Sequence, residues 1–229
     1  MNMRLYLFLL LSMVALAACD FESDTPILSP DKEYKLYDFY EDEYGNRGVV
    51  AYVLEDSYTV VISCDETEAA WGPMGEQVYN GDTISDNIIN MKSFGLAMLQ
   101  SMKARGIEKY PAQAWCDHKN APNSYPNVSS WRLPSHSEMS MFFHTDIQLN
   151  RLNNYIARYG GDIIQKDEMY WTCVEDFDGY LTINNQTSDY DKENRAIVRT
   201  PLNKVYSNKD RWIKKNIYRV RAIKYIYYQ

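Results

Sequence analysis

Two polar stretches near the end of the chain contain the residue types best suited to binding a ligand. Residues 175–179 and 184–194 are rich in carboxylates and amides, which hydrogen-bond hydroxyl groups, and they include a tyrosine ring on which a sugar could stack. The candidate ligand-binding residues are Asp176, Asp178, Asn184, Asn185, Asp189, Tyr190 and Asp191. Irregular segments between strands often carry recognition. The alternative is that both stretches are solvated loops without a partner.

Metal and cofactor chemistry has little support in the sequence. Residues 176–179 (Asp-Phe-Asp-Gly) are similar to part of a calcium loop, but Val174 and Asn185 occupy its first and twelfth ligand positions. A solvated turn between strands is the favoured interpretation, and calcium binding stays open. The three histidines of the chain show neither an HExxH pattern nor a paired spacing. We therefore expect no metal site and no cofactor.

The first nineteen residues are typical of an export signal. Arg4 supplies a positive charge, and the apolar run after it is too short for a membrane-spanning helix. Residues 16–19 (Leu-Ala-Ala-Cys) resemble the lipobox of bacterial lipoproteins, whose Cys thiol takes a diacylglycerol before cleavage. We expect a lipoprotein signal peptide at 1–18, lipidation of Cys19, and a lipidated N-terminus and tether at 19–31. An ordinary signal peptide with a chance cysteine is the alternative.

These features predict an exported protein that a lipid attaches to a bacterial membrane, with the outer membrane favoured. Each buried CH2 of the acyl chains contributes about 0.8 kcal/mol to anchoring. The sequence leaves open whether the protein faces the periplasm or the outside.

Three further cysteines, Cys64, Cys116 and Cys173, lie in the part expected to be exported. That compartment permits disulfides, but three thiols allow one bridge and leave one thiol over, and the sequence does not say which two would pair. The absence of a CxxC pattern argues against a zinc site of thiolates. Cys116 and His118 are two positions apart, which places them on different faces of a helix and disfavours a thiol–imidazole nucleophile.

Composition narrows the class of protein further. Of the 229 residues, 45% are hydrophobic and 24% are charged, which excludes a disordered tail, a collagen and a coiled coil. The net charge of −7 argues against a nucleic-acid partner held by phosphate contacts. The sequons Asn127-Val128-Ser129 and Asn185-Gln186-Thr187 are interpreted as chance matches in a bacterial lipoprotein.

Strand patterns flank a helical middle segment. β-Branched runs predict a hairpin at 48–54 and 58–64. Further strands are expected at 34–40, 170–174, 179–183, 195–199 and 218–227. Apolar residues with a helical period predict helices at 83–105, at 112–118 and from residue 146, the last one ended by Gly160 and Gly161. Because strands and helices do not alternate, we expect an α+β fold in one domain, residues 32–229.

Residues 131–138 form the most specific pattern in the chain, Trp-Arg-Leu-Pro-Ser-x-x-Glu. The Trp is expected to fill the core, the Arg to pair with a carboxylate or loop carbonyls, and the Pro to set the entry of a helix. The Ser and the Glu are spaced to form a capping box. We assign these residues to the scaffold: Trp131, Arg132, Leu133, Pro134, Ser135 and Glu138.

This pattern resembles the motif of the C-terminal domain of Legionella collagen-like adhesins and of the related Fibrobacter major paralogous domain. Those families belong with the formylglycine-generating-enzyme-like branch of the C-type-lectin-like fold. Segments similar to other family motifs follow the same order at 48–53, 114–116, 170–175 and 219–223, so the resemblance runs from about residue 48 to 226. It implies a C-type-lectin-like single domain with mixed antiparallel strands around a helical middle segment.

The chain departs from this family at positions that matter for chemistry. Cys173 and Val174 stand where the family has Ser-Thr, and the copper-binding Cys pair of the formylglycine-generating enzymes has no counterpart near the last strands. The Glu-Pro-Asn and Trp-Asn-Asp triplets of calcium-dependent lectins are also missing. We therefore expect a protein that is not an enzyme.

The favoured function is a non-catalytic cell-envelope lipoprotein that binds a glycan or a surface protein. The alternative is a structural or assembly subunit of a surface fibre or a polysaccharide-uptake complex, and an enzyme of the formylglycine-generating type is the third hypothesis. Exposed Tyr and Trp around a concavity would favour glycan binding. A flat apolar patch or an unpaired strand edge would favour assembly.

Overall fold

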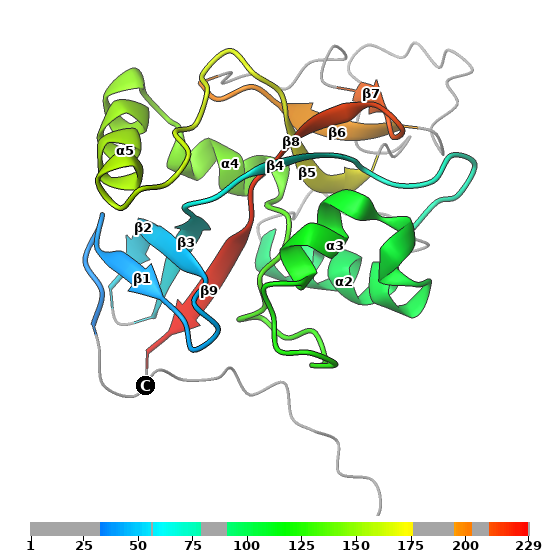
Figure 1. Cartoon of the computed structure of the whole chain (residues 1–229), viewed down its shortest axis with the longest axis horizontal. Coiled ribbons are helices and arrows are strands. Elements are labelled where there is room, and N and C mark those ends of the chain that lie inside the picture. Colours follow the sequence, from blue (N-terminus) through cyan, green and yellow to red (C-terminus); the bar gives the residue numbers. More distant parts are fainter. Residues whose placement is uncertain (1–32, 56, 79–90, 176–194, 203–210, 229) are drawn as a thin grey trace, which may run out of the picture.

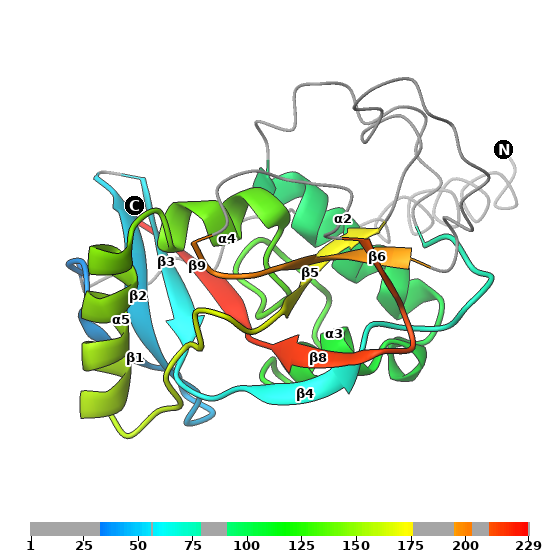
Figure 2. The same ribbon diagram turned by 90° about the horizontal axis from the view of Figure 1, so that it is seen from above.

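The computed structural model describes residues 33–55, 57–78, 91–175, 195–202 and 211–228. They form two β-sheets with helices packed around them (Figure 1; Figure 2 shows the view from above). Cys19, the seven candidate ligand-binding residues between Asp176 and Asp191, and the strand expected at 179–183 lie outside the described residues.

The first sheet has four antiparallel strands in the order β1-β2-β3-β9. Its strands are β1 (Phe39–Glu41), β2 (Arg47–Leu54), β3 (Tyr58–Ser63) and β9 (Ile223–Tyr227). The β-branched pattern therefore predicts the β2–β3 hairpin correctly, and the last strand of the chain pairs with it on the β3 side.

The second sheet has five strands in the order β4-β8-β5-β6-β7. They are β4 (Thr67–Ala70), β8 (Ile217–Val220), β5 (Tyr170–Glu175), β6 (Arg195–Arg199) and β7 (Arg211–Ile213). β5 and β8 are parallel, whereas the other neighbours are antiparallel. Because the strands lie before and after the helices in the chain, this arrangement confirms the α+β class.

The helices occupy the middle of the sequence: α2 (Met91–Ala104), the 3-10 helix η1 (Ile107–Lys109), α3 (Pro111–Asp117), α4 (His136–Phe142) and α5 (Asp146–Arg158). α2 and α3 contact the second sheet through β5 and β4, and α5 packs on β2 of the first sheet. α4 contacts β2, β5 and β6, so this short helix touches both sheets. Gly160 adopts a φ of 71° just after α5, which confirms the predicted helix end.

The first strand is shorter than the sequence predicts. β1 begins at Phe39, whereas the aromatic pattern predicts a strand from residue 34. Tyr37 has a φ of 73°, in the left-handed region that a strand does not use. The Asp38 carboxylate accepts a hydrogen bond from the Lys35 amide at 2.8 Å, which stabilises a turn at this point.

The single strand predicted at 218–227 is wrong. β8 ends at Val220 in the second sheet, and β9 begins at Ile223 in the first sheet. Between them Arg221 is 1% exposed, forms an ion pair with Glu66, and donates to the carbonyls of Ser63 and Asp162. A buried guanidinium needs such partners, and they lie beside the start of the second sheet, so the chain leaves one sheet here and joins the other.

Candidate functional site

The segment 131–138 lies at the seam between the two sheets. The Arg132 backbone exchanges two hydrogen bonds with Ile223 of β9, at 3.0 and 2.9 Å. Two residues further on, the Pro134 carbonyl accepts from the Cys173 amide of β5 at 2.8 Å. The motif therefore connects one strand of each sheet through its backbone.

A buried ion pair stabilises this seam. The two guanidinium nitrogens of Arg132 donate to the two carboxylate oxygens of Glu138 at 2.9 and 2.6 Å, and the side chains are 2% and 0% exposed. The Ser135 amide and the Tyr225 hydroxyl also donate to this carboxylate. The capping box of Ser135 and Glu138 is present as predicted. Burial alone would raise the pKa of Glu138, but the Arg132 charge and these hydrogen bonds lower it below the ordinary value.

Trp131 is fully buried and holds two surface segments in place. Its indole nitrogen donates to the Asp42 carboxylate at 2.9 Å. Its backbone amide donates to Asn120 Oδ1 at 2.7 Å, and Asn120 Nδ2 returns a hydrogen bond to the Trp131 carbonyl. Because Asp42 belongs to the β1–β2 turn and Asn120 to the loop after α3, one core residue fixes both.

A cavity of about 350 Å³ lies where these two segments meet β9. Its walls come from the β1–β2 turn, the loop at 119–130, and residues 224–226, which lie near one another in the lower half of Figure 1. Tyr40, 8% exposed, lines it and packs edge-on against Trp131 with ring centroids 6.1 Å apart. The exposed residues Glu41, Glu43 and Tyr44 contribute to the rim.

Several polar groups of this cavity have no hydrogen-bond partner among the described residues. The Lys224 ammonium lies 3.9 Å from the Asp42 carboxylate and 5.7 Å from the centre of the Tyr40 ring, and makes no hydrogen bond there. The Ser129 hydroxyl is buried and makes no hydrogen bond to any described residue. Asn127 uses its side-chain oxygen to accept from the Ser129 amide, which leaves its Nδ2 donor unused within that set. Burial lowers the pKa of Lys224, and the charges of Asp42 and Glu43 offset part of that effect.

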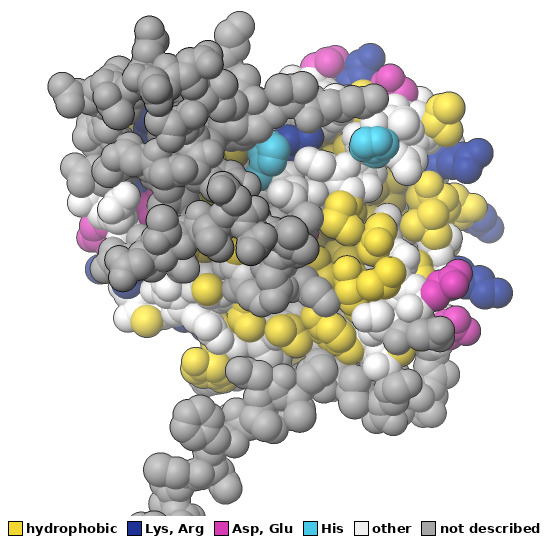
Figure 3. All heavy atoms as spheres, turned by 180° about the vertical axis from the view of Figure 1, so that it is seen from behind, with side chains coloured by type: hydrophobic (Ala, Val, Ile, Leu, Met, Phe, Trp, Pro, Cys, Tyr) yellow, Lys and Arg dark blue, Asp and Glu magenta, His cyan; other side chains and the backbone are white. Residues whose placement is uncertain are grey.

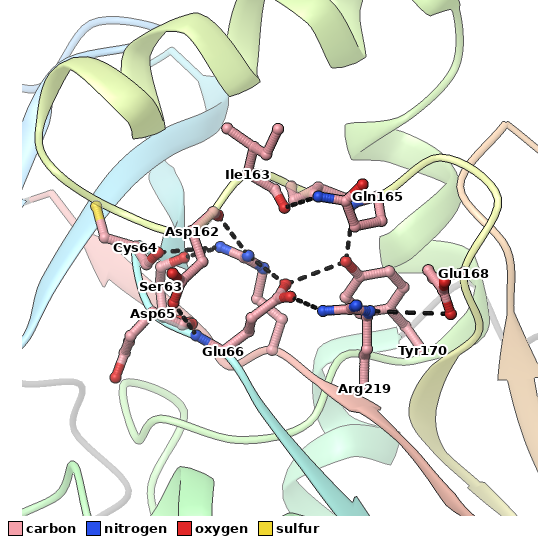
Figure 4. A network of polar contacts seen from close by, with 12 residues as sticks. Ser63, Cys64, Asp65, Glu66, Asp162, Ile163, Gln165, Glu168, Tyr170 and Arg219 are labelled. Atoms are coloured by element: carbon pink, nitrogen blue, oxygen red, sulfur yellow. Dashed lines mark hydrogen bonds and ion pairs between the residues drawn. The ribbon is translucent and has the colours of Figure 1, made fainter.

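A second polar cluster joins the strands of the second sheet. Figure 4 shows the Glu66 carboxylate between Arg219 and the Tyr170 hydroxyl, which donates to it at 3.1 Å. Glu66 also forms an ion pair with Arg221. Burial, followed by the Glu66 charge, raises the pKa of Tyr170 to about 12. Because these opposite charges pair with one another, the cluster holds the start of β4 against β5 and β8, which is a scaffold role.

The three thiols are free and buried. The sequence left one disulfide open, and the structure contains none among Cys64, Cys116 and Cys173. Burial raises the pKa of Cys64 to about 11 and that of Cys173 to about 12, and it also raises the pKa of Cys116. Thiols of this kind are poor nucleophiles at neutral pH. Within the described ranges, no three His, Cys, Asp or Glu side chains come together in a way that would hold a metal ion.

A cluster of buried and half-buried tyrosines packs on the first sheet. Tyr58 contacts Tyr52, Tyr225 and Tyr227 with ring centroids 6.3, 5.2 and 6.0 Å apart. Figure 3, seen from behind, shows hydrophobic side chains gathered on this face of the molecule, with charged ones along its right-hand edge. Large apolar groups on a surface commonly mark contacts with another protein.

The cavity is not the site that sequence reasoning favoured. The candidate residues at 176–191 attract attention because carboxylates and amides are concentrated there, and they lie outside the described residues. Asn127 and Ser129 appear in the sequence only as a chance sequon. The cavity brings together residues about 80 and 100 positions apart, and no local pattern signals such a combination.

Comparison with known proteins defines the class of fold. No protein-family model matches the chain, and no curated protein matches it. Among solved structures, it is similar to the crystal structure of a fimbrial protein from Bacteroides ovatus ATCC 8483, with a TM-score of 0.56 and 12% sequence identity. The match covers 83% of this chain and 48% of that one, so this chain spans about half of its length. At this identity the likeness concerns the fold, and the resemblance to the Legionella and Fibrobacter families stays a prediction. Within the described ranges no helix is long and apolar enough to span a membrane.

Proposed function

We propose that this chain is an exported cell-envelope protein that serves as a structural or accessory subunit of a surface fibre. The observation that carries the proposal is the fold it shares with the Bacteroides ovatus fimbrial protein over 83% of its length. The hydrophobic surface in Figure 3 also supports it, because assembly requires an apolar contact surface. The proposed fibre role replaces glycan or protein binding, which the sequence analysis favoured, as the primary function.

The domain itself is proposed to be C-type-lectin-like, of the branch that the sequence motifs indicate. Contacts between the motif segments in the structure support this proposal. The segments at 131–138, 170–175 and 219–223, which are far apart in the sequence, meet through the Arg132–Ile223 bridge and the Cys173–Pro134 hydrogen bond. Motifs that contact one another are what a shared fold requires. A non-catalytic role is part of the proposal, and the buried thiols with raised pKa values support it.

Attachment to the membrane through lipidated Cys19 completes the proposal. In the bacterium that encodes the chain, the protein should take up a fatty-acid probe, be cleaved by external protease on intact cells, and co-purify with sheared surface fibres. The Cys19→Ala variant should lose the probe. Normal labelling of that variant would refute the lipid anchor, and absence from the fibre fraction of a protein displayed on the surface would refute the fibre role.

A further inference from the structure

The cavity bounded by the β1–β2 turn, the loop at 119–130 and β9 has the general features of a ligand site. It is concave, its wall is aromatic, and its polar groups come from three separate parts of the chain. Its volume of about 350 Å³ is at the lower end of the range for pockets that hold small molecules. All of the residues that line it belong to the described part of the chain.

The donors of the cavity that make no hydrogen bond to the described residues indicate what kind of ligand it could hold. Folded proteins satisfy almost all of their buried polar groups, since an unsatisfied one is destabilising. Ser129 is 6% exposed, and its hydroxyl has no partner among the described residues. Two partly exposed residues line the same cavity with donors that make no hydrogen bond to that set: Lys224, whose ammonium pairs with Asp42 at 3.9 Å, and Asn127, through its Nδ2. Three donors around one cavity suit a ligand that carries several acceptor oxygens.

The charges favour a ligand without net charge. Glu41 and Glu43 lie at the rim, and they oppose the entry of an anion into a chain that already has a net charge of −7. Inside the cavity, Lys224 is paired with Asp42 at 3.9 Å and Lys119 with Asp65 at 2.5 Å, so neither lysine leaves an uncompensated charge among the described residues. A hydroxyl group accepts from an ammonium and donates to a carboxylate, so a neutral polyol satisfies both kinds of charge.

The aromatic wall favours a ring. Tyr40 is held between Tyr34, at 5.8 Å, and Trp131, at 6.1 Å between ring centroids. The ring is therefore fixed before a ligand arrives, which lowers the entropic cost of binding. Tyr44, 53% exposed, provides a second ring at the rim.

From these observations we propose that the cavity binds a neutral saccharide. Lys224, Asn127 and Ser129 donate to its hydroxyl oxygens, Glu41 and Glu43 accept from its hydroxyl groups, and Tyr40 forms the wall beside the ring. This site is distinct from the stretch at 176–191, and it does not depend on the chain being part of a fibre.

The test is calorimetric titration of the full-length protein, in a detergent whose headgroup contains no sugar, with a panel of neutral mono- and disaccharides. One uronic-acid saccharide and one short acidic peptide complete the panel. Binding of at least one neutral sugar at millimolar concentration or better is expected, and Lys224→Met and Asn127→Asp should each weaken it at least about tenfold. Asn127→Asp keeps the oxygen that accepts from the Ser129 amide and removes only the donor.

Ser129→Ala separates a binding role from a structural one. It should weaken sugar binding while leaving the melting temperature unchanged or raised, because it deletes a buried hydroxyl that lacks a partner. The matched control is Lys215→Met, an exposed lysine on the turn before β8, which should bind like the wild type.

Three results would overturn the proposal. They are failure of every neutral sugar to bind, a clear preference for the acidic saccharide or the peptide, and loss of binding in an Asp189→Ala, Tyr190→Ala, Asp191→Ala variant while Lys224→Met binds normally. None of these depends on fibre association, which is measured separately on cells.

Discussion

Replacing Glu138 by Gln is the most direct test of the seam between the sheets. The substitution keeps the size of the side chain and removes one negative charge. In the wild type, each carboxylate oxygen accepts two hydrogen bonds. Oε2 accepts from Arg132 and the Ser135 amide, and Oε1 accepts from Arg132 and the Tyr225 hydroxyl. An amide accepts through only one oxygen, and its NH2 group would face donors.

The expected loss is large because both partners are buried. With Glu138 0% and Arg132 2% exposed, the variant leaves a buried guanidinium without its counter-charge. Breaking a buried pair in this way typically costs about 3–5 kcal/mol. A domain of this kind is stable by about 5–15 kcal/mol, so Glu138→Gln should remove a large share of the free energy of unfolding.

The assay is urea unfolding followed by circular dichroism. The control is Glu68→Gln, because Glu68 is 61% exposed and lies 3.9 Å from Arg219, where a change within about 0.5 kcal/mol is expected. The wild type should also lose stability as the pH falls below the ordinary glutamate value of 4.5, since the folded-state pKa of Glu138 is lower, and the variant should lack that part of the slope. A loss below about 1 kcal/mol in Glu138→Gln would refute the buried pair.

Acid and chemical probes test other buried groups. Burial and the Arg199 charge lower the pKa of His136 from 6.5 to about 4, so stability should be complete above pH 6.5 and fall toward pH 4, and His136→Gln should flatten that slope in urea titrations. Gly95→Ala should lower the melting temperature although Ala favours helices, because its Cβ would overlap the Arg132 guanidinium; an unchanged value contradicts the tight packing. In a Cys19→Ala background, the three remaining thiols should resist a thiol reagent at about pH 8 until urea unfolds the protein, and rapid reaction of the native protein would contradict their burial.

Local patterns predict those elements whose causes are local. The β2–β3 hairpin follows from β-branched residues on both sides of a short turn, and the capping box follows from the spacing of Ser135 and Glu138. The break at Arg221 has a different cause. The residues on either side of it favour strands equally well. The groups that bind the buried guanidinium, the Glu66 carboxylate and the carbonyls of Ser63 and Asp162, are distant in the sequence.

The cavity escapes prediction for the same reason. Lys224 looks like an ordinary outward residue of a terminal strand, and Asp42 looks like an ordinary turn residue. They become neighbours because β9 pairs with β3 and because Trp131 binds the Asp42 carboxylate. A sequence pattern reports spacing along the chain, whereas this cavity depends on which strand lies beside which.

The motif at 131–138 explains why a scaffold segment is the easiest part of this chain to recognise. Two sheets that share no strand need a connection that is independent of strand pairing within either of them. The Arg132 bridge to β9 and the Pro134 bond to β5 supply it through the backbone, and the Arg132–Glu138 pair and the Ser135 cap, which need these particular side chains, hold that backbone in place. The cavity is built on the same Trp131 but only needs donors, acceptors and rings at its wall. These properties can be supplied by several residue types, whereas the buried charge pair and the capping box of the seam need an Arg, a Ser and a Glu at fixed spacing, which is why the sequence signals the seam and not the cavity.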